Sequence, residues 1–129
     1  MTESEFNSLA AQGYNRIPLV LETFADLDTP LSVYLKLANK PHSYLLESVH
    51  GGERFGRYSF VGLPASTRIE VRGTLIRIMD GAKIKEIEAA DPLAFIETYL
   101  SCFKVAPHGA LPRFCGGLVG YFGYDAVRY

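Results

Sequence analysis

Short strand-like segments separated by tight turns fill the middle of this chain, and they constrain its fold most strongly. Residues 67–72 (TRIEVR), 74–79 (TLIRIM) and about 83–87 follow one another, and Asp80-Gly81 is a typical hairpin turn. Strands joined by turns this short run antiparallel. Two further strand-like segments, at about 43–48 and 58–63, precede them. The pattern predicts a largely antiparallel sheet.

Helix signals occur on both sides of these strands. Thr2 and Glu5 have the spacing of a capping box, which predicts a short helix over residues 3–12. Thr29-Pro30 predicts the start of a second helix, and Asp91-Pro92 opens a third that extends to about Phe103. The apolar face expected for the second helix consists of Leu31, Tyr34, Leu35 and Ala38. Helices and strands do not alternate regularly, so we expect an α+β domain with a few flanking helices rather than a doubly wound sheet.

Two more segments have the composition of strands. Ile17–Phe24 is apolar with Pro18 near its start, where a missing N–H is tolerated. Phe114–Tyr124 is rich in glycine and aromatic residues. No acidic, basic or histidine side chain follows Gly116 until Asp125, so this second segment indicates packing rather than chemistry.

The size and charge of the chain limit the kinds of protein to which it can belong. The 129 residues suit one domain, and the net charge of −1, with thirteen scattered basic residues, gives no reason to expect nucleic acid. The acidic N-terminus is unlike a secretory signal, and no apolar run approaches the roughly 20 residues of a membrane span. Cys102 and Cys115 do not form a CxxC pair. We therefore expect a soluble, cytoplasmic domain that does not contact a membrane.

A polar pair, Glu47-Ser48, ends the apolar segment that begins at Tyr44. Strand alternation places Tyr44, Leu46 and Ser48 on one face, with Glu47 on the other. An unpartnered buried polar group costs roughly 1–3 kcal/mol, so something must satisfy this pair. The partner is either nearby backbone or Arg54, or else a small amino-acid-like ligand. The chemistry alone favours the first explanation and leaves the second open.

Candidate catalytic groups are sparse. Residues 51–57 contain glycines and arginines but match neither a P-loop nor a dinucleotide-binding motif, so a hairpin whose arginines pair with Glu47 or Glu53 is favoured. The histidines share no metal-ligand spacing, and each is expected to be a solvated loop residue: His42, His50 and His108. The residues indicate a binding domain rather than a complete active site.

Three segments together carry a resemblance to a known family. They are Leu45–Ser48 (LLES), Gly56–Gly62 (GRYSFVG), and Leu111–Phe114 followed by the Gly116–Asp125 run and Val127–Tyr129. Their order and spacing extend over almost the whole chain. The sequence resembles the N-terminal region of anthranilate synthase component I, in the family of chorismate-utilising enzymes. His50 is a departure, because family members often carry an acidic residue there.

The resemblance implies that residues 1–129 are the regulatory N-terminal region, and that their fold is the N-terminal portion of the chorismate-utilising enzyme fold. It implies that the LLES segment lines an allosteric site for the inhibitor L-tryptophan. Ser48 would lie closest to the inhibitor, and Leu46 and Glu47 would shape the pocket. The catalytic region would lie in a later part of a longer chain, so the chain alone is expected to be inactive.

The resemblance also implies an activity and partners. The full enzyme would convert chorismate and ammonia to anthranilate and pyruvate in L-tryptophan biosynthesis. A glutamine amidotransferase subunit, component II, would supply the ammonia, and Mg²⁺ would be held by residues of the catalytic region, none of them in this chain. Two alternatives stay open here: aminodeoxychorismate synthase component I of folate synthesis, and a stand-alone module that binds a small molecule.

Overall fold

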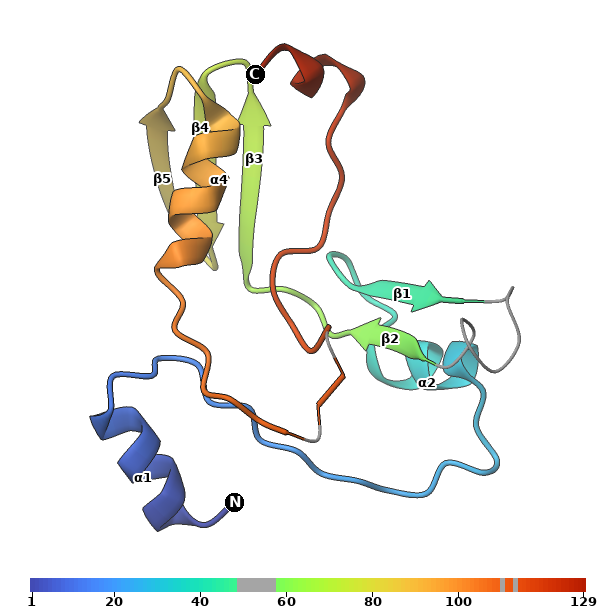
Figure 1. The fold of residues 1–129 in the computed structure, drawn as a ribbon. Coiled ribbons are helices and arrows are strands. Elements are labelled where there is room, and N and C mark those ends of the chain that lie inside the picture. Colours follow the sequence, from blue (N-terminus) through green and yellow to red (C-terminus); the bar gives the residue numbers. More distant parts are fainter. Residues whose placement is uncertain (49–57, 110, 113) are drawn as a thin grey trace. The chain divides into compact units, whose positions relative to one another are not determined.

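The protein mixes helices with two small sheets (Figure 1). The structure, a computed structural model, describes residues 1–48, 58–109, 111–112 and 114–129. In chain order the elements are α1 (Glu3–Ala11), α2 (Pro30–Leu37), β1 (Tyr44–Glu47), β2 (Ser59–Gly62), β3 (Thr67–Arg72), β4 (Leu75–Asp80), β5 (Lys83–Glu88), α4 (Pro92–Ser101) and the 3₁₀ helix η1 (Tyr124–Arg128). The predicted α+β class is confirmed.

Each sheet is built from strands joined in sequence order. β1 pairs antiparallel with β2, and β3, β4 and β5 form a three-stranded sheet in that order. Two-residue turns at 73–74 and 81–82 connect the strands of the second sheet, so neighbouring strands in it are antiparallel. The predicted antiparallel arrangement is therefore confirmed for both sheets.

The helices begin where the sequence signals place them. The Glu5 N–H donates to Thr2 Oγ1 at 3.2 Å, and the Thr2 N–H donates to Glu5 Oε2 at 2.7 Å, which completes the predicted capping box. In α4 the Asp91 carboxylate accepts from the N–H groups of Leu93 and Ala94 at 2.9 and 3.0 Å. These side chains satisfy backbone donors that have no partner inside the helix.

The chain forms two compact units. The first comprises residues 1–22, 71–76 and 87–129, and the second comprises residues 23–70 and 77–86. In the first unit, Asn15 joins the segment after α1 to the segment after α4. Its Nδ2 donates to the Cys102 carbonyl at 2.7 Å, and its Oδ1 accepts from the Lys104 N–H at 2.8 Å. One side-chain amide thereby uses both its donor and its acceptor to hold these two segments together.

Arg16 extends this junction within the first unit. It forms a parallel β-bridge with Val105, and the Ala106 N–H donates to the Arg16 carbonyl at 2.8 Å. The Arg16 guanidinium lies 4.5 Å from the centre of the Phe103 ring, a cation–π contact. Backbone and side chain of Arg16 therefore both anchor the residues after α4.

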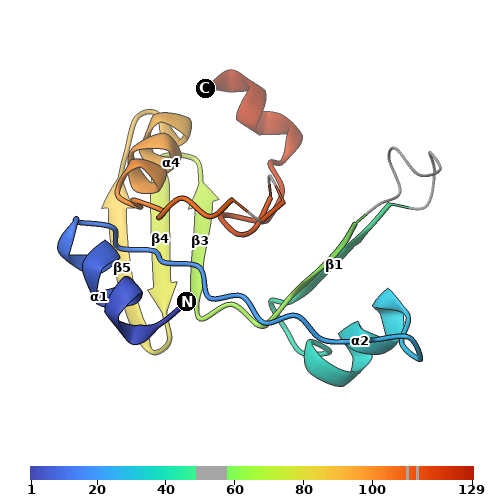
Figure 2. The same cartoon turned by 60° about the horizontal axis from the view of Figure 1, so that its bottom comes forward.

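In the second unit, α2 packs beside the β1–β2 hairpin, as Figure 2 shows from a second side. Ala38, at the end of α2, is fully buried. The start of α2 is anchored by Asp28, whose carboxylate accepts from Lys36 Nζ at 2.6 Å and from Ser32 Oγ at 2.7 Å. These two bonds, with that of Lys36 the stronger influence, lower the pKa of the Asp28 carboxyl below its ordinary value.

Two predicted strands are wrong. Residues 17–24 and the described part of 114–124 form no strand in the structure. Gly116 and Gly117 have φ values of 152° and 132°, a region that other residues rarely enter, and this interrupts the second segment. The first segment has strand composition, but a strand also needs a hydrogen-bonding partner, and among the described residues the only β-bridge next to it is that of Arg16.

Much apolar surface in the described residues is uncovered. The buried apolar residues there are Ala38, Ile76, Met79 and Ala106. Leu21, Phe24 and Leu27 are at least 91% exposed, and on the predicted apolar face of α2 Leu31 and Leu35 are exposed too. An apolar surface of this extent is unusual for an isolated soluble domain. None of the helices in the described ranges has the length and apolar character that crossing a membrane requires.

The cap of α4 provides a test of this account. Asp91→Ala in the full-length protein removes the acceptor for two N–H groups, which costs about 1 kcal/mol. We expect amide hydrogen exchange in the first turn of α4 to become about fivefold faster, as measured by mass spectrometry. Asp91→Asn keeps a side-chain oxygen at the cap and should exchange almost as slowly as the wild type. Equal exchange in the alanine variant and the wild type would contradict the assigned cap.

Candidate functional site

The β1–β2 hairpin positions the residues predicted to bind a ligand. Leu46 and Glu47 are the last two residues of β1, and Ser48 follows directly. Leu46 is 46% exposed, and both Glu47 and Ser48 are exposed. All three are therefore accessible at one end of the hairpin.

The register of the hairpin separates these residues onto two faces. Tyr44 pairs with Gly62, Leu46 with Phe60, and Glu47 with Ser59. Because side chains alternate along a strand, Leu46 shares a face with Phe60, and the continuing alternation places Ser48 on that face as well. Glu47 lies on the opposite face with Ser59. The structure brings Leu46 and Ser48 together and does not bring Glu47 to them.

Two aromatic residues that the sequence did not single out complete this face. Tyr58 and Phe60 lie two residues apart on or just before β2, and their ring centres are 6.3 Å apart with the planes tilted by 35°. Tyr58 is 48% exposed. The alternation in Tyr58-Ser59-Phe60 places the two aromatic rings on one face of β2. It could have indicated that they join Leu46 only if the register of β2 against β1 had been known. Together, Leu46, Phe60, Tyr58 and Ser48 present an apolar surface that ends in a hydroxyl; we call this the Ser48 face.

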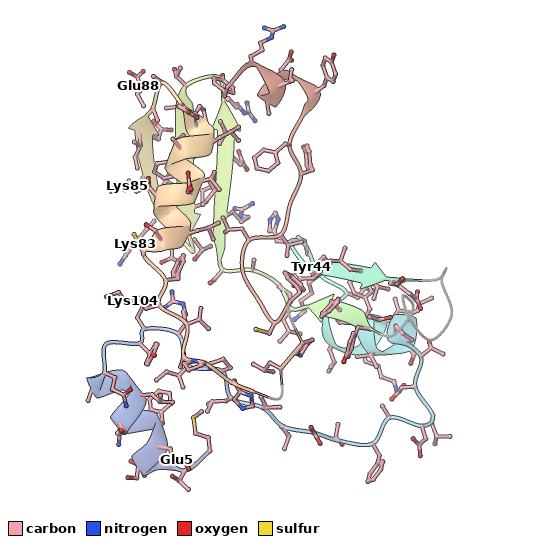
Figure 3. The ribbon with its side chains drawn as sticks, viewed as in Figure 1. Glu5, Tyr44, Lys83, Lys85, Glu88 and Lys104 are labelled. Carbon is pink, nitrogen blue, oxygen red and sulfur yellow. The ribbon has the colours of Figure 1, made fainter. Side chains whose placement is uncertain are left out.

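The Tyr44 ring covers the backbone of β2 at the other end of this face. A Cβ atom at position 62 would overlap Cδ1, Cε1 and Cζ of the Tyr44 ring. Glycine at 62 therefore provides the space that the ring occupies. Figure 3 labels Tyr44 at the start of β1.

Several bonds hold the open end of the hairpin. Tyr34 Oη, on α2, and Ser43 Oγ are 3.2 Å apart, and Ser43 Oγ donates to the Lys40 carbonyl at 2.6 Å. The Ala65 N–H donates to the His42 carbonyl at 2.9 Å, which links the segment before β1 to the segment after β2. His42 Nε2 also lies 2.7 Å from Arg68 Nη1. The exposed position predicted for His42 is confirmed, although this histidine is bonded as well.

The other histidines do not join the Ser48 face. His108 lies in a loop as predicted and is half-buried; its Nδ1 atom is buried and has no hydrogen-bond partner among the described residues. It lines a hollow of about 660 Å³ along α1 with Met1, Ser4, Glu5, Ser8, Leu9 and Gln12. His50 and the predicted loop at 51–57, with Glu53, Arg54 and Arg57, lie outside the described residues.

Metal ligands do not gather in the described part of the chain. No three side chains of His, Cys, Asp or Glu lie close enough there to hold a metal ion. Cys102 and Cys115 are both free and exposed. The described residues therefore do not fit a magnesium site, and none of them is assigned to Mg²⁺.

Comparison with curated proteins decides the family. A protein named "Anthranilate synthase component 1" from Pseudomonas putida is 59% identical to this chain over 130 residues, which cover 100% of the chain and 26% of that protein. The chain belongs to the anthranilate synthase component 1 family. Proteins of the same name from Neisseria meningitidis and Aquifex aeolicus are 56% and 42% identical over 98% and 92% of the chain.

The family membership confirms the resemblance and leaves some details as predictions. The chain spans about a quarter of the length of the relatives it matches. The shared name of these relatives favours anthranilate synthase over aminodeoxychorismate synthase. No family model and no solved structure matches the chain. The chorismate-utilising fold and the roles of Ser48, Leu46 and Glu47 therefore stay predictions.

The Tyr44–Gly62 pair gives a prediction for the hairpin. Gly62→Ala in the full-length protein should destabilise the hairpin by about 1–3 kcal/mol, because the new methyl group displaces the ring. In a Tyr44→Leu background the same substitution should cost little, so the two changes should be strongly non-additive. Hydrogen exchange of the β1 and β2 amides measures both costs. Additive effects would show that the ring and the glycine do not contact each other.

Proposed function

We propose that this chain is the tryptophan-sensing part of an anthranilate synthase component I. The observation that carries the proposal is the Ser48 face, which the LLES segment forms with β2 in a member of this family. Its apolar surface of Leu46, Phe60 and Tyr58 suits an indole ring. The Ser48 hydroxyl suits a charged amino-acid head group, since it can donate or accept a hydrogen bond.

The three predicted residues take different parts in this proposal. Ser48 bonds the inhibitor directly, and Leu46 contacts its side chain. Glu47 points to the opposite face, so it acts on the pocket by positioning the strand rather than through the same ligand surface. The exposed state of Leu46 and Ser48 supports this assignment, because a ligand can reach both.

Control follows if tryptophan binds one arrangement of the full-length enzyme better than another. The inhibitor then shifts the population toward the less active arrangement by its difference in affinity for the two. Sensing is separate from the chemistry, in which chorismate and ammonia give anthranilate and pyruvate. The groups that perform the chemistry, together with the Mg²⁺ ligands, lie in the part of the full-length protein outside this chain.

The proposal includes a partner and a location. Relatives named component 1 imply a second component in the complex. We assign to it the glutamine amidotransferase activity that releases ammonia. The enzyme acts in the cytoplasm, which suits two free cysteines that are not in a CxxC pair.

Substitution of Ser48 tests the inhibitor site. Ser48→Ala in the full-length enzyme removes a hydrogen bond to a charged group, worth roughly 1.5–3 kcal/mol. The tryptophan concentration for half-inhibition should rise about ten- to a hundredfold. Assays of anthranilate formation across a tryptophan titration measure this shift.

Ser59 supplies a matched control on the same hairpin. It is an exposed serine on the face opposite Ser48, so Ser59→Ala should leave tryptophan inhibition unchanged. A Ser48→Ala enzyme inhibited like the wild type would remove Ser48 from the site. A wild-type enzyme that tryptophan does not inhibit would refute the sensing function and reopen the alternative in folate synthesis.

A further inference from the structure

The backbone of His42 has an unusual conformation. In the part of the chain that the structure describes, His42 is the one residue other than glycine with a positive φ, and its φ of 65° is a value that residues with a side chain rarely adopt. It lies in the turn before β1, and its carbonyl accepts from the Ala65 N–H at 2.9 Å. Such a conformation persists only where surrounding contacts hold it. The contacts of His42 therefore matter for the turn that they hold.

The side chain of His42 makes the second of these contacts. Its Nε2 atom lies 2.7 Å from Nη1 of Arg68, near the start of β3. An arginine side chain can only donate hydrogen bonds, so Nε2 accepts, and the imidazole is neutral with its hydrogen on Nδ1. Protonation would put a hydrogen on Nε2 and a second positive charge beside the guanidinium. The contact therefore requires a neutral ring.

Solvent protons can reach this ring. His42 is exposed, and histidine is the side chain that ordinarily changes its charge between pH 5 and 8. The bond between His42 and Arg68 can therefore be made and broken within the range of pH in which proteins remain folded.

The charged groups on the adjoining elements give Arg68 an alternative partner. These groups are Lys40 before β1, Glu70 on β3, and Arg77 and Asp80 on β4. Arg77 and Asp80 already bond Glu86 and Thr67. Lys40 is itself positive, so it does not compensate the charge of a protonated ring. Glu70 lies two residues beyond Arg68 and, by strand alternation, on the same face of β3, so its carboxylate can accept the guanidinium.

We propose that His42 and Arg68 form a pH-sensitive latch between the turn before β1 and the start of β3. With a neutral imidazole the two side chains bond and the latch is closed. Protonation breaks this bond, Arg68 turns to Glu70, and the backbone bond from Ala65 to His42 loses its support. The closed latch binds one proton fewer than the open latch, so acidification favours the open form. This inference does not depend on the proposed tryptophan-sensing function.

Amide hydrogen exchange of the full-length protein tests the latch. Mass spectrometry follows peptides that contain Ala65, and each rate is divided by the intrinsic rate of an unprotected amide at the same pH. Between about pH 7.5 and about pH 5.5 the protection of these peptides should fall about two- to tenfold, the usual effect of one hydrogen bond. Peptides from α4 in the same samples should keep their protection, since α4 lies in the other compact unit.

Three variants identify the groups responsible. Asparagine also tolerates a positive φ but does not change its charge in this range, so His42→Asn should remove the dependence on pH. Arg68→Leu removes both the donor and the charge, and it should give low protection at either pH. His108→Asn is the matched control, because it replaces a loop histidine of the first unit and should retain the wild-type response.

Each alternative outcome overturns the latch. Equal protection of the wild-type Ala65 peptides at both pH values would show that the contact does not respond to protonation. An equal fall in α4 would show a general loss of stability. A fall in His42→Asn as large as that of the wild type would assign the response to another group. If His42→Asn does not fold, a wild-type response retained in Arg68→Leu refutes the latch, and its loss there supports it.

Discussion

The pairing of β1 with β2 decides which side chains share a surface, and the candidate site depends on it. In the observed register, Leu46 lies opposite Phe60 and Tyr44 lies opposite Gly62. A shift by one residue would turn every side chain of one strand to the other face. Leu46 and Ser48 would then lose their aromatic neighbours on β2. The bond from Ala65 to His42 and the fit of Tyr44 over Gly62 both oppose such a shift.

The elements that sequence reasoning predicted correctly depend on nearby residues. A capping box needs two residues three apart, and the N-cap Asp91 bonds N–H groups two and three residues away. A hairpin with a two-residue turn is likewise specified by the residues of the turn itself. The two wrong strands, at 17–24 and 114–124, have apolar or aromatic composition but no local feature that provides a partner. Strand pairing is a contact between distant residues, and composition alone does not specify it.

The candidate site was only partly predictable for the same reason. Alternation along one strand placed Leu46 and Ser48 on one face and Glu47 on the other, and the hairpin has this arrangement. Tyr58 and Phe60 were missed because their position relative to Leu46 depends on the register between two strands. The ligand itself was suggested by the family resemblance and not by the residues, whose chemistry alone favoured hydrogen-bond partners within the protein.

The contacts of Asn15 have a consequence for the order of folding. Its two partners, Cys102 and Lys104, lie 87 and 89 residues further along the chain. At a synthesis rate of about 5–20 residues per second, roughly 5–20 seconds pass between the synthesis of Asn15 and the synthesis of these two partners. During that interval α1 is held by local contacts, among them its capping box and the bond from Gln12 Nε2 to Ser8 Oγ. The segment after α1 can therefore be fastened only once α4 has been synthesised.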